Sequence, residues 1–401
     1  MVAHGRFIKI PKNSSENQSG WYNEQKRKVT RMVIMMQERF KMIEDPRHQS
    51  YVTHRLSDIL IIVMCAVLCG LDELSTIMTY AQNKASMFKD EFGIEAIPSK
   101  PTMSRVLGMI DGEAIAKVII GIMKDTASKV GEVIAVDGKA IRSTSKTAQP
   151  HSALQIITAY LTESSVVLGQ EKINEKTNEI PVFQEMLSYI DVNGKTITAD
   201  ALHCQRETCA KIIEKHGDYV FGLKDNQKTL HDDVELFFCD AVNKKEFETY
   251  TTQEKNGGRI EKRVCRKLAN LDWLESKAAW RGLKTVFAVT RTVTAKGFVT
   301  EETSYYISSL NVSAEKLLNI SREHWKIESL HWMLDVVFSE DSCRLETENA
   351  HITLNLFRKL AVLLHRQFIA QSKKKVSVRT NMLNCLITDS VLFDVFCCSN
   401  L

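Results

Sequence analysis

The stretch Gly131-Glu-Val-Ile-Ala-Val-Asp-Gly-Lys-Ala-Ile-Arg142 decides how the rest of the chain is interpreted. The apolar run before Asp137 has the length and the β-branched content of a buried strand. Asp137 is therefore expected at or near the end of that strand, and Gly138 lets the backbone turn or approach a partner closely. Lys139 and Arg142 follow, where they would favour an anionic substrate. An aspartate that merely begins a turn is the alternative, so the interpretation depends on carboxylates elsewhere in the chain.

A second short strand also ends on a carboxylate, in Lys195-Thr-Ile-Thr-Ala-Asp200. Around it, strand-like and helix-like segments alternate in the order β-β-β-α-β-α-β-α, which predicts a mixed α/β sheet with helices packed on it. The remaining segments of this series are strands at 154–161, 165–170 and 219–224 and helices at 181–190, 205–215 and 227–241.

Residues 246–310 break the alternation. Turn signals at Lys255-Asn-Gly-Gly258 and Ala295-Lys-Gly297 separate strand-like segments, which predicts a β-rich insertion. The chain is expected to return as a long helix from about Ser313.

The N-terminal part differs in charge and in pattern. Residues 1–50 contain ten Lys or Arg against five Asp or Glu, which favours a polyanionic partner but also fits a solvated basic surface. We expect a basic extension at 1–45, a helical and DNA-binding domain at 46–129, a catalytic domain at 130–370 and a tail at 371–401. Pro98 and Pro101 bracket a turn before residues 102–107, which suggests a helix-turn-helix, although a plain helical bundle is slightly favoured.

Bulk composition excludes several classes of protein. With 401 residues, 44% hydrophobic, 25% charged and a net charge of +4, the chain is typical of globular proteins with two or three domains. Its ten cysteines form no CxxC pair, which argues against a zinc module or a disulfide framework and favours reduced thiols. The longest apolar run, 59–71, is too short to span a bilayer and predicts a buried helix. No secretory signal opens the chain, so we expect a cytoplasmic protein.

A third carboxylate lies on a predicted helix at 321–338. At about 100° per residue, Glu328 shares one face with His331 and opposes an apolar stripe. Trp325 and Trp332 lie on the side of Glu328, away from that stripe. Core packing is their expected role, and stacking on a flipped or frayed base is the alternative.

Two aspartates at strand ends and a glutamate on a later helix suit one chemistry well. Mg²⁺ prefers oxygen ligands and keeps waters that a substrate phosphate can displace. A pair of such ions about 4 Å apart can activate an attacking oxygen and stabilise the leaving oxygen at phosphorus. Asp137, Asp200 and Glu328 are therefore the predicted metal ligands, provided that the sheet brings them together.

Several motifs in the sequence resemble those of a known family, the bacterial insertion-sequence DDE transposases of the H-repeat-associated type. The likeness runs in collinear order from about Glu44 to Arg366. The motifs that carry the likeness are Val136-Asp-Gly-Lys139, Leu168-Gly-Gln170, Asn178-Glu-Ile180, Thr198-Ala-Asp-Ala-Leu-His203, Leu223-Lys-Asp-Asn-Gln227, Gly258-Arg-Ile-Glu261, Tyr306-Ile-Ser-Ser-Leu310, His324-Trp-Lys-Ile-Glu328, Leu334-Asp-Val336 and Glu340-Asp341.

The resemblance implies an RNase H-like catalytic core with a β-rich insertion, preceded by a helical domain. It places the DDE triad on Asp137, Asp200 and Glu328, with Mg²⁺ as cofactor and Mn²⁺ as a substitute. The partners implied are the terminal inverted repeats of a transposon and target DNA. Because both ends of an element must be processed together, we expect at least a homodimer on DNA.

One departure from the broader group concerns the residues that grip phosphate. Tyr, Arg and Lys, which related transposases place around the glutamate, are here Ser321, His324 and Asp335. Other side chains must replace them, with Arg322, Lys326 and His331 as the first candidates. The complete set of predicted DNA contacts is Lys139, Arg142, Lys224, Arg322, His324, Trp325, Lys326, His331 and Trp332.

The function predicted is therefore that of a transposase that cleaves phosphodiester bonds to free 3′-OH ends and transfers these ends to target DNA. One alternative keeps the fold but lacks strand transfer, as in a nuclease of the RNase H class. A second alternative is a DNA-binding protein descended from a transposase that no longer catalyses a reaction. Three converging carboxylates argue against the second alternative, because binding alone does not require them.

Overall fold

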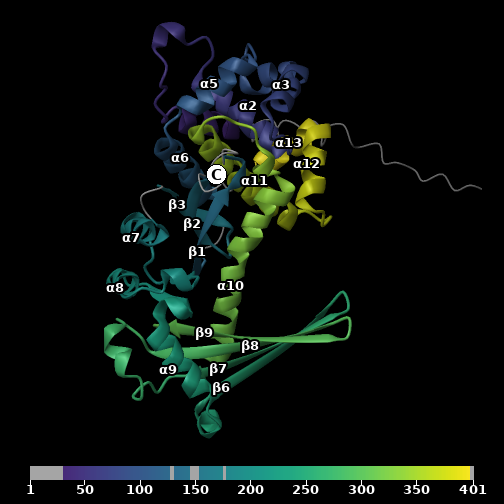
Figure 1. The fold of residues 1–401 in the computed structure, drawn as a ribbon. Helices are drawn as coiled ribbons and strands as arrows, with labels where there is room; N and C mark the ends of the chain where they lie inside the picture. The colour runs from purple at the N-terminus through teal and green to yellow at the C-terminus, as the bar shows by residue number, and fades with distance from the viewer. Residues whose placement is uncertain (1–29, 127–130, 145–152, 175–177, 398–401) are drawn as a thin grey trace, which may run out of the picture. The chain divides into compact units, whose positions relative to one another are not determined.

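The computed structural model describes residues 30–126, 131–144, 153–174 and 178–397, which form two compact units (Figure 1). The first unit contains the described residues up to Val106 and those from Leu364 onward, and the second contains 107–363. The predicted basic extension lies largely outside the described residues, although 30–40 are helical. In the described part of the chain, no helix combines the length and the apolar character that crossing a bilayer would require.

The first unit is helical. The predicted buried helix is confirmed, since every residue of α2 (Leu56–Leu68) is buried. His365 fixes the end of this helix, because one ring nitrogen lies 3.0 Å from the Leu68 carbonyl oxygen and the other 2.9 Å from the Asn381 amide. Pro101 lies in the first turn of α5, where its missing N–H is tolerated. The remaining helices of this unit are α3 (Leu74–Asn83), α4 (Ala85–Phe92), the first part of α5 (Lys100–Met109), the last part of α11 (Glu348–Gln371), α12 (Val378–Ile387) and α13 (Asp389–Phe396).

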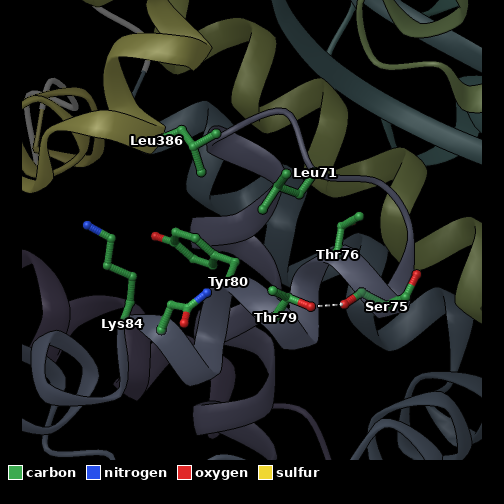
Figure 2. A pocket seen from close by; sticks show the side chains of 8 residues that line it. Leu71, Ser75, Thr76, Thr79, Tyr80, Lys84 and Leu386 are labelled. Carbon is green, nitrogen blue, oxygen red and sulfur yellow. Dashed lines mark hydrogen bonds between the residues drawn. The ribbon is translucent and has the colours of Figure 1, made fainter.

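A pocket of about 470 Å³ opens in the first unit beside α3 (Figure 2). Its walls carry hydroxyl, amide and aromatic groups but no carboxylate. The Lys84 ammonium at its edge is neutralised by Asp389, at 2.7 Å. This lining offers no set of groups suited to phosphoryl transfer.

The second unit confirms the predicted alternation and the mixed sheet. Its elements are α6 (Gly112–Thr126), β1 (Val133–Ile141), β2 (Leu154–Leu161), β3 (Val166–Ile173), α7 (Glu179–Tyr189), β4 (Thr196–Ala199), α8 (Arg206–Glu214), β5 (Asp218–Leu223), α9 (Lys228–Cys239), β6 (Glu248–Asn256), β7 (Arg259–Leu268), β8 (Thr285–Ala295), β9 (Phe298–Ser308), α10 (Ala314–Trp332) and the first part of α11.

The nine strands found in the described residues belong to one sheet, in the order β3-β2-β1-β4-β5-β9-β8-β7-β6. Strands β1, β4 and β5 are parallel, and every other neighbouring pair is antiparallel. The β-rich insertion is present, and it extends the core sheet because β9 pairs with β5. Its two long hairpins reach away from the core strands (Figure 1), and Phe298 near one tip is 79% exposed.

The position of Asp137 within its strand differs from the prediction. We expected it at or near the end of the strand, but β1 continues to Ile141. The continuation follows from the neighbouring strands, because β2 still pairs at Ile141 with Leu154, whereas pairing with β4 ends at Val136. Asp137 therefore lies in the middle of β1, at the level where its neighbour β4 stops.

The long helix α10 begins where the sequence predicts, with the Ser313 side chain accepting a hydrogen bond from the backbone N–H of Lys316. Instead of one α-helix to residue 338, its last turn is a π-helix, Met333–Val337. The backbone N–H of Phe338 donates to the Met333 carbonyl oxygen at 3.1 Å, five residues earlier. Such π-turns widen a helix locally and are frequent at functional sites.

Two glycines with left-handed backbones give a matched test of the packing in the second unit. A Cβ on Gly282 (φ +78°) would lie 2.7 Å from Ile213 Cδ1, whereas a Cβ on Gly297 (φ +81°) would meet no atom within 4 Å. We expect Gly297→Ala to lower the free energy of unfolding by about 1 kcal/mol, from backbone strain alone. Gly282→Ala should lower it by about 2–4 kcal/mol, because overpacking adds to the strain. Denaturant unfolding of both variants checks this, and equal effects would contradict the packing around Gly282.

Candidate active site

The parallel pairing of β1 with β4 brings Asp137 and Asp200 to the same level of the sheet. The last paired residues are Val136 and Ala199, so each aspartate follows its strand's last pair by one residue. Paired residues share a face of a sheet and alternate along each strand, so both aspartates lie on the face that carries Thr198. One oxygen of Asp200 accepts a hydrogen bond from the backbone N–H of Leu202 at 3.1 Å, which orients this carboxylate.

Helix α10 crosses this face of the sheet with one polar stripe turned toward the aspartates. His324, Glu328, His331 and Asp335 are spaced by four, three and four residues and so share one side of the helix. The neighbours of Glu328 along this stripe contact β4 on one side and β1 on the other, which holds Glu328 between them, over the aspartate pair. The contacts are His324 Nδ1 to Thr198 Oγ1 at 3.4 Å, His331 Nδ1 to Asp137 Oδ2 at 3.4 Å and Lys139 Nζ to Asp335 Oδ1 at 2.6 Å.

A pocket of about 280 Å³ lies where this stripe meets the sheet. Asp200 and Glu328 both line it, together with His324 and Trp325 of α10. Residues from β5, β9 and α9 form the opposite wall, so the insertion contributes directly to the site. Asp137 is not among the lining residues and lies beside Asp200, on the next strand.

Electrostatics couple the three carboxyl groups. Burial and then the charge of Asp200 raise the pKa of Asp137 to about 7, with smaller contributions from Glu179 and Glu328. The backbone N–H of Gly138, which donates to Asp137 Oδ1 at 2.9 Å, opposes the shift. Burial also raises the pKa of Glu328. The ionised form of Asp137 is therefore energetically unfavourable here, and a bound cation would stabilise it.

The donor types fit a hard divalent cation, because all three groups offer carboxylate oxygens. Among the described residues, however, no three His, Cys, Asp or Glu side chains lie close enough to hold a metal ion as they stand. Mutual repulsion of like charges opposes a closer approach when no cation compensates them. The strands and α10 therefore bring the three carboxylates into one region without placing all three at the distance of metal ligands.

The sequence did not single out Glu179, which lies at the start of α7 on the other face of β1. Its carboxylate occupies the space where a Cβ on Gly138 would be, with Oε1 at 2.4 Å from that position. His203, which is 1% exposed, lies with Nε2 at 3.4 Å from Glu179 Oε2. The sequence did contain a signal for these two residues, since both belong to motifs that carry the family resemblance.

Lys139 follows Asp137 by two residues on the same face of β1 and is held by two carboxylates. Its ammonium is 2.6 Å from Asp335 in the π-turn and 2.8 Å from Glu340, and only 9% of its side chain is exposed. In this structure its charge is directed inward and ties β1 to the end of α10. Ser339 assists with a left-handed backbone (φ +49°), which turns the chain so that Glu340 becomes fully buried. A contact between Lys139 and DNA remains a prediction.

Glu340 is the centre of a buried ionic network. It accepts hydrogen bonds from Lys139 at 2.8 Å, Asn355 at 2.9 Å and Arg358 at 3.3 Å. Although burial alone would raise it, the cations Arg358 and Lys139 lower the pKa of Glu340 to about 2. The network joins β1, the π-turn and α11, so it fixes the strand of Asp137 relative to the helix of Glu328.

The other predicted DNA contacts lie at several positions around the site. Lys224 is exposed and lines the pocket, and Arg142 is exposed with a weak contact of 3.9 Å to Asp341. Arg322 is paired with Glu254 of β6 at 2.8 Å, and Lys326 with Glu323 at 2.6 Å. Burial lowers the pKa of His324, and burial followed by nearby lysines lowers that of His331 to about 3, so both imidazoles are neutral.

The two tryptophans of α10 are not part of the core. Trp325 is 54% exposed and lines the pocket, and Trp332 is 57% exposed. The expectation of core packing is therefore wrong. The physical reason is that the polar stripe of α10 faces the sheet, so the positions beside it point outward between the sheet and solvent.

A mixed sheet with two aspartates at one level of parallel β1 and β4, crossed by a helix that bears a glutamate, is an RNase H-like core of the DDE type. Comparison with known proteins identifies the family. The family model described as "Transposase DDE domain" matches residues 128–364, and a second, described as "DDE_Tnp_1-associated", matches 37–123. The chain belongs to the DDE transposases. Because a transposase acts on DNA, DNA is its class of substrate.

Relatives support the same family along nearly the whole chain. The "H repeat-associated putative transposase YhhI" of Escherichia coli K12 is 33% identical over 89% of this chain and 98% of its own length. The "Putative transposase YncI" of Escherichia coli O157:H7 is 33% identical over 84% of this chain and 90% of its own length. Among solved structures, a piggyBac transposase synaptic complex with hairpin DNA matches 90% of this chain and 80% of its own, with 10% identity and a TM-score of 0.43.

The raised pKa of Asp137 predicts how stability depends on pH without metal. As the pH rises from about 4 to about 7, the unfolded chain loses this proton before the folded chain does, so folding becomes less favourable. Asp137→Asn removes this penalty and keeps an acceptor for the Gly138 N–H. At pH 7.5 with EDTA, the free energy of unfolding of the variant should be about 1–3 kcal/mol higher than that of the parent. At pH 4 the two values should be equal. Denaturant unfolding at both pH values measures this, and a variant that is less stable at pH 7.5 would contradict the account.

The Glu340 network gives a second stability test. Glu340→Gln removes the carboxylate that both Lys139 and Arg358 share, and we expect a loss of about 3 kcal/mol because it leaves buried cations uncompensated. Glu132→Gln is the control, since Glu132 pairs with Lys316 at 2.8 Å on the exposed surface. That change should have little measurable effect. Similar losses in the two variants would mean that the buried network does not stabilise the fold.

Proposed function

We propose that this transposase binds the terminal inverted repeats of its own element, cleaves a phosphodiester bond to free a 3′-OH, and joins that end to target DNA. The observation that carries the proposal is the placement of Asp137 and Asp200 at one level of β1 and β4, with Glu328 held above them by its neighbours on α10. Two carboxylates that line one pocket, with a third beside them on the next strand, are more than recognition of DNA requires.

Asp137, Asp200 and Glu328 would together hold divalent cations, Mg²⁺ or in its place Mn²⁺. When bound, such ions supply an activated oxygen nucleophile and stabilise the leaving oxygen. The chain's own groups orient the reactants. Asp200 accepts a hydrogen bond from the Leu202 N–H. Asp137 accepts one from the Gly138 N–H, and the neutral His331 ring lies 3.4 Å from its other oxygen.

Basic and aromatic groups around the pocket would position DNA. Lys224 and Arg142 are exposed and free to meet phosphates, and Lys326 and Arg322 would exchange an intramolecular carboxylate for phosphate. Trp325 at the rim and Trp332 nearby offer exposed aromatic faces on which a base could stack. The remaining candidates for DNA contact are Lys139, His324 and His331. They would act from positions behind the carboxylates, farther from the DNA.

Both ends of an element must be processed together, so we infer that the active form is a homodimer on DNA. Such a protein would work in the bacterial cytoplasm, on the nucleoid. Analytical ultracentrifugation with a terminal-repeat duplex tests the dimer directly.

The triad is tested by Asp137→Asn, Asp200→Asn and Glu328→Gln, each with DNA that flanks the reading frame. Each variant should bind this DNA as the parent does, while Mg²⁺-dependent strand cleavage falls by at least about a hundredfold. Asp233→Asn, an exposed aspartate of α9, is the control and should cleave normally. Retained cleavage in a triad variant would remove that residue from the mechanism.

Strand transfer is tested separately, with a labelled terminal-repeat duplex that already ends in a 3′-OH and a supercoiled target plasmid. Joined product in Mg²⁺ is the expected result. Cleavage without joining would indicate a nuclease of the RNase H class, and binding without either reaction would indicate a DNA-binding descendant of a transposase.

A further inference from the structure

A buried lysine lies next to the candidate active site and has no role in the proposed chemistry. Lys359 of α11 is 3% exposed. Its ammonium donates hydrogen bonds to Thr158 Oγ1 at 2.9 Å and to Gln170 Oε1 at 2.6 Å, and both acceptors are neutral and buried. Burying an ammonium without a directly bound carboxylate is costly. Its presence therefore calls for a functional explanation.

The sheet register relates this ammonium to the catalytic pair. Thr158 of β2 is paired with Asp137 of β1, and Gln170 of β3 is paired with Thr158. Cross-strand partners lie on the same face, about 5 Å apart. Gln170, Thr158, Asp137 and then Asp200 thus form one polar row across four strands, and Lys359 is fixed over its first two members.

The charged groups that act on Lys359 are neighbours of the site, Glu340 and Lys139. Burial is the largest influence on its pKa and, with Lys139, lowers it to about 7, while Glu340 acts in the opposite direction. Lys359 is in turn the strongest influence after burial on the lowered pKa of His331, whose ring lies 3.4 Å from Asp137. Glu340 is already shared by two other cations, so it compensates Lys359 only in part.

We propose that Lys359 is a resident cation of the active site, a positioning residue that partly balances the carboxylates in the free protein and opposes divalent ions there until DNA phosphates add negative charge. The proposal rests on the proposed function, since it requires metal binding at Asp137. It makes firm binding of the ions conditional on bound DNA. An idle protein would then hold its ions weakly, which protects the chromosome from uncontrolled cleavage.

The experiment is a Mn²⁺ titration of the full chain without DNA at pH 6.5, below the pKa of Lys359, followed by the electron paramagnetic resonance signal of free Mn²⁺. Lys359→Met removes the charge and keeps an unbranched side chain that is one atom shorter. We expect it to bind Mn²⁺ about tenfold more tightly than the parent, because one repulsive charge is removed from within several ångströms of the site. Lys359→Gln, which also keeps a hydrogen-bond donor, should shift the affinity in the same direction. Adding the terminal-repeat duplex should narrow the difference between parent and variants.

Two controls separate the possible failures. Lys374→Met removes an exposed lysine and should leave the affinity unchanged. Asp137→Asn should abolish the binding, which shows that the titration reports the active site. If the parent shows no Mn²⁺ binding sensitive to Asp137→Asn even with DNA, the proposed function itself fails. If the parent binds but both folded Lys359 variants bind equally or more weakly, Lys359 is only a packing residue and the inference is overturned.

Discussion

The structure depends on one electrostatic constraint, which is that carboxylates of like charge must be held side by side in a partly buried place. Two adjacent parallel strands achieve this for Asp137 and Asp200, because their register is fixed by backbone hydrogen bonds that the side-chain charges cannot displace. The energetic penalty remains visible in the raised pKa of Asp137. A site of this kind is poised for cations, and the fold, not the carboxylates, supplies the stability.

The surrounding elements resist the same repulsion. The polar stripe of α10 spans β1 and β4. The buried Glu340, which follows α10 in the chain, binds cations from β1 and α11, so that the end of α10 stays beside β1. The π-turn allows Asp335 to reach Lys139 at the point where the helix passes β1. The β-rich insertion adds another wall, because β9 joins the sheet at β5 and its residues line the pocket. The contacts that stabilise the fold therefore also position the three carboxylates.

Much of this could be predicted from the sequence. The alternation of strands and helices, the insertion and the start of α10 follow from hydrophobic period and turn residues, which are local signals. The extension of β1 beyond Asp137 and the exposure of Trp325 could not, because they depend on which strand pairs where and which helix face meets the sheet. Glu340 and Lys359 were missed as partners for the same reason: nothing local marks a charge that will be buried beside residues about 200 positions away. The sequence suggested which carboxylates could act together, but only the fold relates their positions.

The most direct measurement of the central claim is anomalous X-ray diffraction from crystals of the chain with Mn²⁺ and a terminal-repeat duplex. The account predicts an anomalous peak within about 2.2 Å of carboxylate oxygens from both Asp137 and Asp200, with Glu328 drawn into the same site. Manganese bound elsewhere, or a peak that Asp200 shares with residues other than Asp137, would contradict it.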